Sequence, residues 1–393
     1  MKKNYILLLL FSTLFGFGQI PTGYYNSATG TGYALKTQLK KIIDNVSDGL
    51  SPEYIAVDKG YGSGTSQSNN GLWSAYGTTD RDMGIGYEND NTIVDIYSEN
   101  PTGVDPYNYN FNTASGSNNG QCGSYTGEGN CYNREHIIPK SYFGQAAPMV
   151  SDVQHIYPTD GKVNAEHNDF AYGKVNVASF TSQNGSKLGT ALNSGYSAGF
   201  SGTVFEPIDE FKGDIARVYL YFATRYEDQM ATFYTTYTAV DCRVMFDGSA
   251  NKVFSATFLN ILLTWNAQDP VSTKEIVRNN AAFNHQTNRN PYIDHPEYVT
   301  SIWGSPLATD SFDISSTNIS VFPNPTNDHK INIQSDVTLD EIDLININGQ
   351  LVQAIKKPVM SNNIFTLENL PQGFYFIKLT SDNQTITKKV VVN

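Results

Sequence analysis

A polar segment near the middle of the chain combines side chains that can hold a metal ion and move a proton. Glu135 and His136 are adjacent, and Asn164 and Asn168 follow four residues apart. A hard cation such as Mg²⁺ takes oxygen ligands and keeps several waters, so one carboxylate and one amide oxygen leave room for a phosphate. A neutral imidazole nearby can take the proton of an attacking water. The set predicts phosphodiester hydrolysis with one divalent cation. We expect Mg²⁺, with Mn²⁺ and Ca²⁺ as alternatives.

Two short strands and a helix are expected to position these groups. Residues 135–138 and 154–157 are predicted strands, and each is followed by a proline that ends it. Residues 164–170 are a predicted short helix. Because Asn164 and Asn168 are four residues apart, they share one helical face. The sequence therefore predicts a ββα unit in which this face carries an amide oxygen toward the first strand.

Three motifs in this region follow one another in a fixed order. They are Glu135-His136-Ile137-Ile138-Pro139, Asp152-Val153-Gln154-His155-Ile156-Tyr157-Pro158 and Val163-Asn164-Ala165-Glu166-His167-Asn168. This order resembles the endonuclease I family, secreted and periplasmic non-specific nucleases of the His-Me finger (ββα-metal) class. Residues 213–221 and 286–294 also resemble that family, so the resemblance covers most of residues 30–305.

The resemblance implies a role for each matching residue. His136 is the implied general base, and Glu135 and Asn164 are the implied metal ligands. His155 and Asn168 occupy matching positions that we interpret as structural or orienting. The family also implies 5′-phosphate products and action on DNA, often also on RNA.

The arginine that steadies the scissile phosphate is left open by the sequence. Better-known family members carry it between the first two motifs, but this chain has no arginine between Lys140 and Asp152. Arginine suits the role because its planar fork matches phosphate oxygens. The candidates are Arg134, Arg217 and Arg289.

Several of these side chains also have a structural interpretation. Arg217 fits a buried ion pair with Asp214 or another acid as well as a phosphate contact. His155 is expected to be a hydrogen-bonded core histidine. His167 is expected to be solvated on its helix beside Glu166.

Two further features bear on metal and redox chemistry. The acidic stretch from residues 80–82 to 88–90 is compatible with a structural Ca²⁺ site, which the sequence alone does not favour. Three cysteines fit an oxidising compartment. We expect Cys122 and Cys131, which flank a glycine-rich loop, to form a disulfide and Cys242 to remain free and buried, although the other two pairings stay open.

The N-terminus has the features of a secretory signal peptide. Lys2 and Lys3 precede an apolar run at residues 6–15, and small residues precede the expected cleavage before Gln19. The run is too short to span the ~30 Å hydrocarbon core of a bilayer. No other segment approaches that length, so we expect no membrane span.

The C-terminal part changes in character. Six short alternating runs separated by turn-forming residues predict a small β-sandwich. The runs are residues 319–322, 330–333, 341–346, 351–355, 373–379 and 385–392. Val321-Phe322-Pro323-Asn324-Pro325 and the terminal Lys388-Lys389-Val390-Val391-Val392 resemble the C-terminal sorting domain of the type IX secretion system. That resemblance implies export by the type IX machinery and removal of the tail. An adhesive or sugar-binding sandwich is the alternative.

The overall charge is an argument against long-range attraction of a polyanion. The 393 residues carry a net charge of -12, and charged residues make up only 16% of the chain, below the usual ~25%. Nucleic-acid-binding proteins are expected to be basic. We therefore expect modest affinity for nucleic acid, confined to a local patch and weakened by salt.

The complete prediction is an α+β protein with a ββα-metal (His-Me finger) core embedded in a helix-rich domain, plus a small C-terminal all-β sandwich. The predicted parts are a signal peptide at 1–18, a nuclease domain at 19–312, a linker at 313–318 and a sorting domain at 319–393. We expect a secreted or cell-surface monomeric endonuclease that cuts DNA without sequence specificity. An extracellular ribonuclease with the same site, or a non-enzymatic glycan-binding or adhesion protein, is the alternative.

Overall fold

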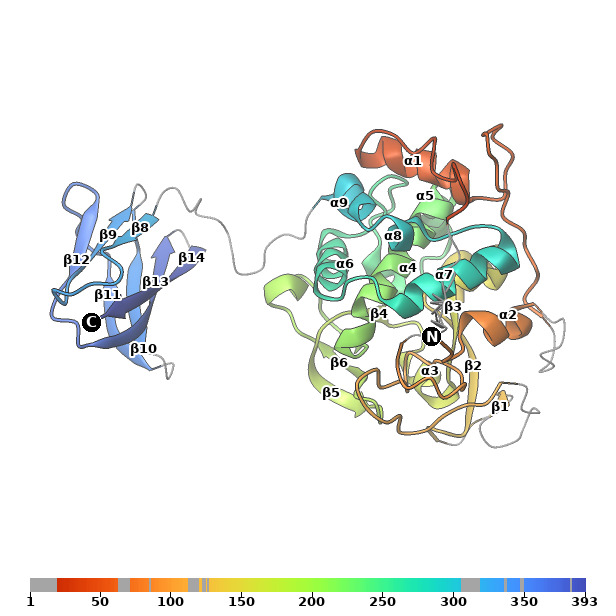
Figure 1. Cartoon of the computed structure of the whole chain (residues 1–393), viewed down its shortest axis with the longest axis horizontal. Coiled ribbons are helices and arrows are strands. Elements are labelled where there is room, and N and C mark those ends of the chain that lie inside the picture. The colour runs from red at the N-terminus through yellow and green to blue at the C-terminus, as the bar shows by residue number, and fades with distance from the viewer. Residues whose placement is uncertain are drawn as a thin grey trace, which may run out of the picture. The chain divides into compact units, whose positions relative to one another are not determined.

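The computed structural model describes residues 20–62, 71–84, 86–111, 120–121, 125, 127–304, 319–335, 338–346, 350–381 and 384–393. The predicted signal peptide, the linker and Cys122 lie outside these ranges. The chain divides into two compact units, residues 1–306 and 307–393 (Figure 1). Each is described separately.

The candidate residues of the first unit lie on a small sheet. Strand β2 (Cys131–His136) pairs antiparallel with β3 (Ile156–Asp160), which places Glu135 opposite Tyr157. The short β1 (Gly120–Gln121) pairs with the other edge of β2. Both long strands are displaced from their predicted ranges, and Pro158 lies within β3 instead of ending it.

Helix α3 (Gly161–His167) follows β3 directly. The carboxylate of Asp160 caps it by accepting the amide hydrogen of Val163 at 2.8 Å. A side-chain cap of this kind stabilises a helix start. The predicted strand–strand–helix order is therefore present, and the helix spans residues 161–167 where 164–170 was predicted.

A layer of helices supports this unit. Helix α4 (Lys212–Arg225) is buried along its whole length and lies against α6 (Ala256–Gln268) and α1 (Gly32–Ile43). Helix α7 (Thr273–Gln286) begins with a capping box between Ser272 and Glu275, which satisfies amides at the helix start. The other helices are α2 (Leu72–Thr79), α5 (Glu227–Thr236), α8 (Pro291–Asp294) and α9 (Glu297–Trp303).

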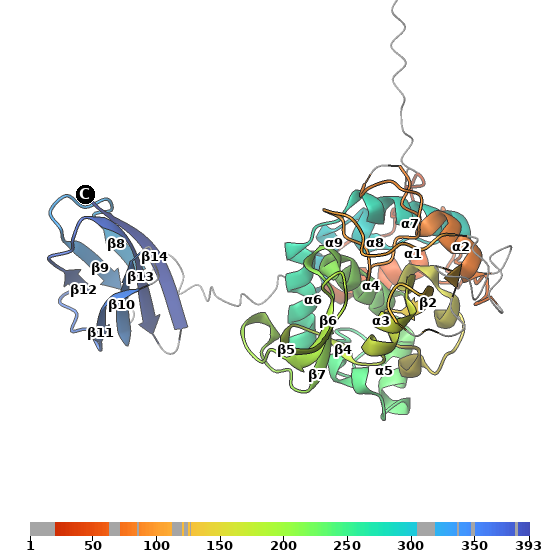
Figure 2. The same cartoon turned by 90° about the horizontal axis from the view of Figure 1, so that it is seen from below.

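A second sheet in the first unit was not predicted. Its strands are β4 (Ala171–Tyr172), β5 (Val175–Thr181), β6 (Lys187–Ala191) and β7 (Thr203–Glu206), in the order β4-β7-β6-β5. Helix α3 lies between this sheet and β2 in both views (Figures 1 and 2). Residues 92–97, whose alternating pattern resembles a strand, instead form a single bridge at Ile93 followed by a turn.

The second unit is entirely β in its described residues. One sheet has the order β11-β10-β13-β14 and the other β12-β9-β8, and every paired strand is antiparallel. Their bounds are β8 (Ile319–Phe322), β9 (Ile331–Ser335), β10 (Glu341–Asn346), β11 (Leu351–Lys356), β12 (Ile364–Leu367), β13 (Gly373–Ser381) and β14 (Gln384–Val392). Residues of both sheets share one hydrophobic core. Six of the seven strands match predicted runs, and β12 was missed.

The mixed α and β composition of the first unit and the all-β tail agree with the predicted fold class. Among the described residues, no helix is long and apolar enough to cross a bilayer.

Candidate functional site

A cavity of about 350 Å³ opens between β2, α3 and the segment around Tyr61. It gathers residues from β2, from the segment that follows β2, and from α3 and its C-terminal end. They are Tyr61, Trp73, Asn133, Arg134, Glu135, His136, Pro139, Lys140, Asn164, Ala165, Asn168 and Asp169. Five of the predicted site residues thus line one cavity, although they are up to 34 positions apart in sequence.

Glu135 is held from the protein interior by two side chains. Oε1 accepts a hydrogen bond from the Tyr97 hydroxyl at 2.9 Å and lies 2.6 Å from Nδ1 of His167. The Tyr97 hydroxyl also contacts the Tyr172 hydroxyl at 2.6 Å. Since the hydroxyl hydrogen of Tyr97 is donated to the Glu135 carboxylate, the hydrogen bond between the two tyrosines must be donated by the Tyr172 hydroxyl. Glu135 therefore sits at the end of a short hydrogen-bonded chain that fixes one of its oxygens.

His167 differs from its prediction. It was expected to be solvated beside Glu166, but its side chain is fully buried against Glu135. Its Nε2 lies 3.1 Å from the carbonyl oxygen of Phe170. Glu166 instead pairs with Lys162 on the outer face of α3.

His136 is oriented so that one ring nitrogen is left for chemistry. Its Nε2 donates to the carbonyl of Val150 at 3.2 Å, so Nδ1 carries the lone pair, and no described residue bonds to Nδ1. The ring stacks on Tyr61, with centroids 5.8 Å apart. Burial, followed by the nearby His155 ring, holds the pKa of His136 well below its ordinary value. His136 is therefore neutral at pH 7 and can accept a proton at Nδ1.

Glu135 and Asn164 each keep an oxygen for a cation. Both contacts of Glu135 involve Oε1, and no described residue bonds to Oε2. Asn164 donates from Nδ2 to Oδ1 of Asn133 at 2.6 Å, which leaves its own Oδ1 without a protein partner among the described residues. One carboxylate oxygen and one amide oxygen on the same cavity fit a hard divalent cation that retains waters.

Arg134 is the arginine that the structure brings to the cavity. Its Nη1 donates to the carbonyl of Tyr61 at 2.6 Å, and its guanidinium lies 3.4 Å from the centroid of the Tyr61 ring and 4.3 Å from that of Trp73. These contacts fix the guanidinium beside His136. Lys140 adds an exposed positive charge to the same cavity.

Arg217 and Arg289 lie elsewhere. Arg217 makes a two-pronged ion pair with Glu275, at 2.6 and 2.7 Å, and lies 3.6 Å from Asp214. Arg289 makes an equivalent pair with Asp294 at 2.6 and 2.7 Å. Both side chains are buried. The guanidinium groups of Arg217 and Arg289 are occupied by carboxylates, whereas Arg134 lines the cavity.

The remaining motif residues support the strands. His155 is fully buried, and its Nε2 donates to the Met149 carbonyl at 2.7 Å. Asp152 pairs with Arg225 at 2.7 Å and accepts from Tyr226 at 2.8 Å. Asn168 ends α3 with a positive φ of 50° and lines the cavity.

The predicted Cys122–Cys131 disulfide involves a residue outside the described ranges and stays a prediction. Cys242 is free and buried, as expected.

The sequence did not predict that Tyr97 and His167 contact Glu135 from the protein interior. His167 stands three residues after Asn164, so helical spacing alone places both on one face. Tyr97 gives no such signal, because it lies 38 residues before Glu135 in an irregular segment.

Comparison with known proteins finds a family match in each of the two units. The family described as Endonuclease I matches residues 31–297, and the family described as the secretion system C-terminal sorting domain matches residues 320–393. An extracellular ribonuclease of Bacillus amyloliquefaciens is 32% identical over 287 residues, covering 71% of this chain and 78% of that protein. The extracellular ribonuclease of Bacillus subtilis is 30% identical over the same length and the same shares of both chains. Endonuclease-1 of Buchnera aphidicola is 24% identical over 177 residues, covering 40% of this chain and 60% of that protein.

Proposed function

The chain belongs to the endonuclease I family and is a secreted or cell-surface nuclease, and from that premise we propose that it cuts DNA without sequence preference, using one divalent cation. Mg²⁺ is the cation we propose. The observation that carries the proposal is the neutral His136, whose free Nδ1 shares a cavity with the free oxygens of Glu135 and Asn164.

His136 is the proposed general base. Its Nδ1 takes a proton from the attacking water as the water oxygen bonds to phosphorus. The bond from phosphorus to the 3′ oxygen breaks, and that oxygen takes a proton from solvent. The products carry a 5′-phosphate and a 3′-hydroxyl. The Val150 carbonyl keeps the imidazole in the required tautomer through the bond from Nε2.

Glu135 and Asn164 are the proposed metal ligands. When bound, the cation would polarise the phosphoryl oxygen and stabilise the charge on the leaving oxygen. Tyr97 and His167 fix the Glu135 carboxylate in the orientation that leaves Oε2 free. Arg134 is the proposed phosphate contact, since its guanidinium is held at the cavity by Tyr61 and Trp73.

RNA is the second candidate substrate. It is supported by the two relatives at 32% and 30% identity, both of which are named extracellular ribonucleases. The distinction depends on contacts near the 2′ position of the sugar. The same purified protein acting on plasmid DNA and on a structured RNA of equal nucleotide concentration gives the two rates directly.

The experiment is nicking of supercoiled plasmid by the purified protein in Mg²⁺ and in EDTA, with His136→Ala and a matched His295→Ala. His295 lies outside the cavity and pairs with Glu297. We expect cleavage in Mg²⁺ alone, a loss of about 10²–10⁴ in rate for His136→Ala, and an unchanged rate for His295→Ala. Cleavage in EDTA, or a His136→Ala rate equal to wild type, would contradict the proposal. Absence of cleavage of either nucleic acid by folded protein would favour the glycan-binding alternative for this cavity.

A further inference from the structure

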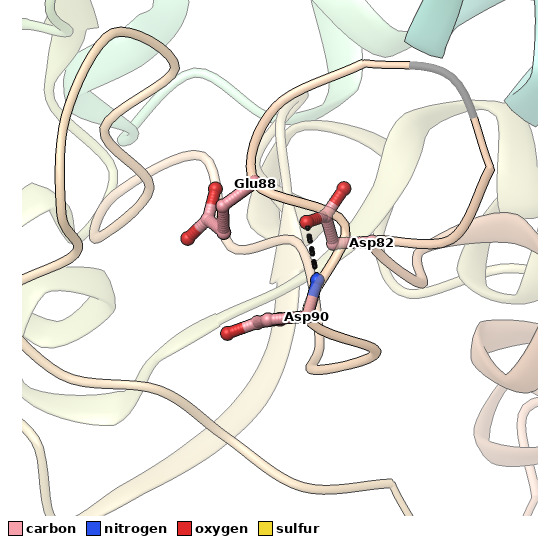
Figure 3. Close-up of side chains that lie close together, drawn as sticks. All are labelled: Asp82, Glu88 and Asp90. Atoms are coloured by element: carbon pink, nitrogen blue, oxygen red, sulfur yellow. Dashed lines mark hydrogen bonds between the residues drawn. The ribbon is translucent and has the colours of Figure 1, made fainter.

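Five carboxylates gather on the first unit outside the cavity already described. Asp82, Glu88 and Asp90 bring carboxylate oxygens within 4.8 Å of one another, and so do Glu88, Glu99 and Asp105. Glu88 belongs to both groups. Figure 3 shows Asp82, Glu88 and Asp90 on adjoining parts of one loop, where the Asp82 carboxylate accepts the Asp90 amide hydrogen at 3.1 Å. We refer to these five residues as the acidic cluster.

Glu99 has an oxygen that no protein group satisfies. Its side chain is 1% exposed, and Oε1 has no hydrogen-bond partner in the structure. Burial, followed by the charges of Asp105 and Glu88, raises the pKa of Glu99 to about 10. A buried carboxylate without a partner is costly unless it is paired or coordinates a metal ion. The Glu99 carboxyl group therefore lies against Glu88 and Asp105 with one oxygen that a bound cation could coordinate.

The protein supplies little positive charge to the acidic cluster. Lys274 forms an ion pair with Asp82 at 2.5 Å. Among the described residues, the ion pairs of the acidic cluster involve this lysine alone. Backbone bonds fix two members: Asp90 accepts the Thr92 amide at 2.9 Å, and Asp105 accepts the Asn100 amide at 2.6 Å. Two of the five carboxyl groups are thus held in place by backbone amides, and one lysine lies beside the group.

We propose that the acidic cluster is a Ca²⁺ site, with Glu88, Glu99 and Asp105 as its central ligands. Ca²⁺ takes six to eight oxygens in a flexible arrangement, whereas Mg²⁺ keeps several waters and uses only one or two carboxylates. A cluster of five carboxylates suits the larger ion. This site is separate from the cavity of Glu135 and does not depend on the proposed function.

The site has a structural connection to that cavity. Glu99 lies in the same turn as Tyr97: the Asp95 carbonyl accepts the amide hydrogens of Ser98 and Glu99, and the Asp95 carboxylate accepts that of Tyr97. Tyr97 in turn donates to Glu135. A cation on Glu99 would fix the turn that orients the catalytic carboxylate. This consequence, unlike the site itself, rests on the proposed function.

The test is thermal unfolding of the full chain in EDTA, CaCl₂ and MgCl₂, together with calorimetric titration of metal-free protein with CaCl₂. At 100 times the dissociation constant, we expect Ca²⁺ to raise the midpoint of the wild type by about 5–10 °C. Glu99→Gln and Glu88→Gln should lose that rise, while Glu210→Gln, an exposed control far from the acidic cluster in sequence, should keep it. Asn164→Ala should also keep it, because its substitution affects only the catalytic cavity.

The metal-free state provides a second readout. In EDTA, Glu99→Gln should be about as stable as the wild type, because a carboxyl whose pKa is raised to about 10 is already uncharged near pH 7 without a cation. A Ca²⁺ rise that is equal in wild type, Glu99→Gln and Glu88→Gln, or absent from the wild type, would overturn the proposal. If Glu99→Gln fails to fold, Glu88→Gln carries the test, because its side chain is exposed. Loss of the rise in Asn164→Ala alone would place Ca²⁺ in the catalytic cavity and would likewise overturn it.

Discussion

Tyr97→Phe removes one oxygen atom, the hydroxyl that donates to Oε1 of Glu135 at 2.9 Å. A hydrogen bond to a charged group contributes about 1.5–3 kcal/mol, and each 1.36 kcal/mol is tenfold in an equilibrium constant. If that energy orients the carboxylate for its cation, the affinity for Mg²⁺ should fall about 10–100-fold, the range found for partners that orient metal ligands.

The assay separates metal binding from chemistry. Plasmid nicking is measured against Mg²⁺ concentration, which gives the half-saturating Mg²⁺ and the rate at saturation. Tyr97→Phe should raise the half-saturating concentration about 10–100-fold and leave the saturated rate within a few-fold of wild type. Changing the base at His136 should do the reverse.

Tyr172→Phe is the matched control. It removes a phenolic hydroxyl from the same buried group, 2.6 Å further along the chain of donors. Its effect on half-saturating Mg²⁺ should be smaller than that of Tyr97→Phe, because Tyr172 acts on Glu135 only through Tyr97. Urea unfolding of both variants measures the stability that each hydroxyl provides. Equal Mg²⁺ curves for wild type and Tyr97→Phe would refute the reasoning and leave His167 as sufficient to orient Glu135.

His136→Ala should lower the saturated nicking rate by about 10²–10⁴ with little change in half-saturating Mg²⁺; a change confined to the Mg²⁺ dependence would contradict its role as base. Burial lowers the pKa of His155 to about 4, against about 6.5 unfolded. Between these values only the unfolded chain binds the proton, so stability rises with pH, and urea unfolding should give about 2 kcal/mol less stability at pH 5 than at pH 7.5 from this group. Equal stability at both pH values would show that His155 can be protonated in the folded protein. Asp152→Asn leaves the Arg225 cation buried and should cost about 3–5 kcal/mol, whereas the exposed Asp228→Asn should cost under about 1 kcal/mol; equal urea midpoints for the two variants would contradict a buried pair.

The ββα unit could be predicted because its signals are local. Two short runs, a turn and amides four residues apart lie within one stretch of the sequence. The exact limits of the strands could not be predicted, and Pro158 illustrates the reason. Proline was expected to end a strand because it cannot donate to the ladder. In the part of the chain that the structure describes, β3 is the edge of its sheet and pairs with β2 alone. The missing donor of Pro158 therefore faces no second described strand, and β3 continues to Asp160.

The partners of buried charges were beyond sequence reasoning. Arg217 pairs with Glu275, which is 58 residues away, and nothing in either local pattern indicates the other. His167 was misinterpreted for the opposite reason, since the adjacent Glu166 offered a local partner. Lys162 forms an ion pair with Glu166 across one turn of α3. The His167 side chain instead points inward and contacts Glu135. Local charge patterns predict exposed pairs well, but burial decides between competing partners, and burial is a property of the assembled fold.

The acidic net charge sets how strongly a nucleic acid can be held. Four arginines are in buried ion pairs, with Glu275, Asp152, Asp80 and Asp294, so their charges are not available to phosphates. At the cavity Arg134 and Lys140 are opposed by Glu135 and Asp169. Since each phosphate neutralised contributes about -0.9 to the slope of log affinity against log salt concentration, two cations predict a slope near -2. Fluorescence anisotropy with a labelled duplex, Ca²⁺ in place of Mg²⁺ and the His136→Ala variant measures this slope without turnover. A slope several times steeper would mean that a basic surface elsewhere on the molecule holds the substrate, and that the cavity contributes chemistry but little of the binding.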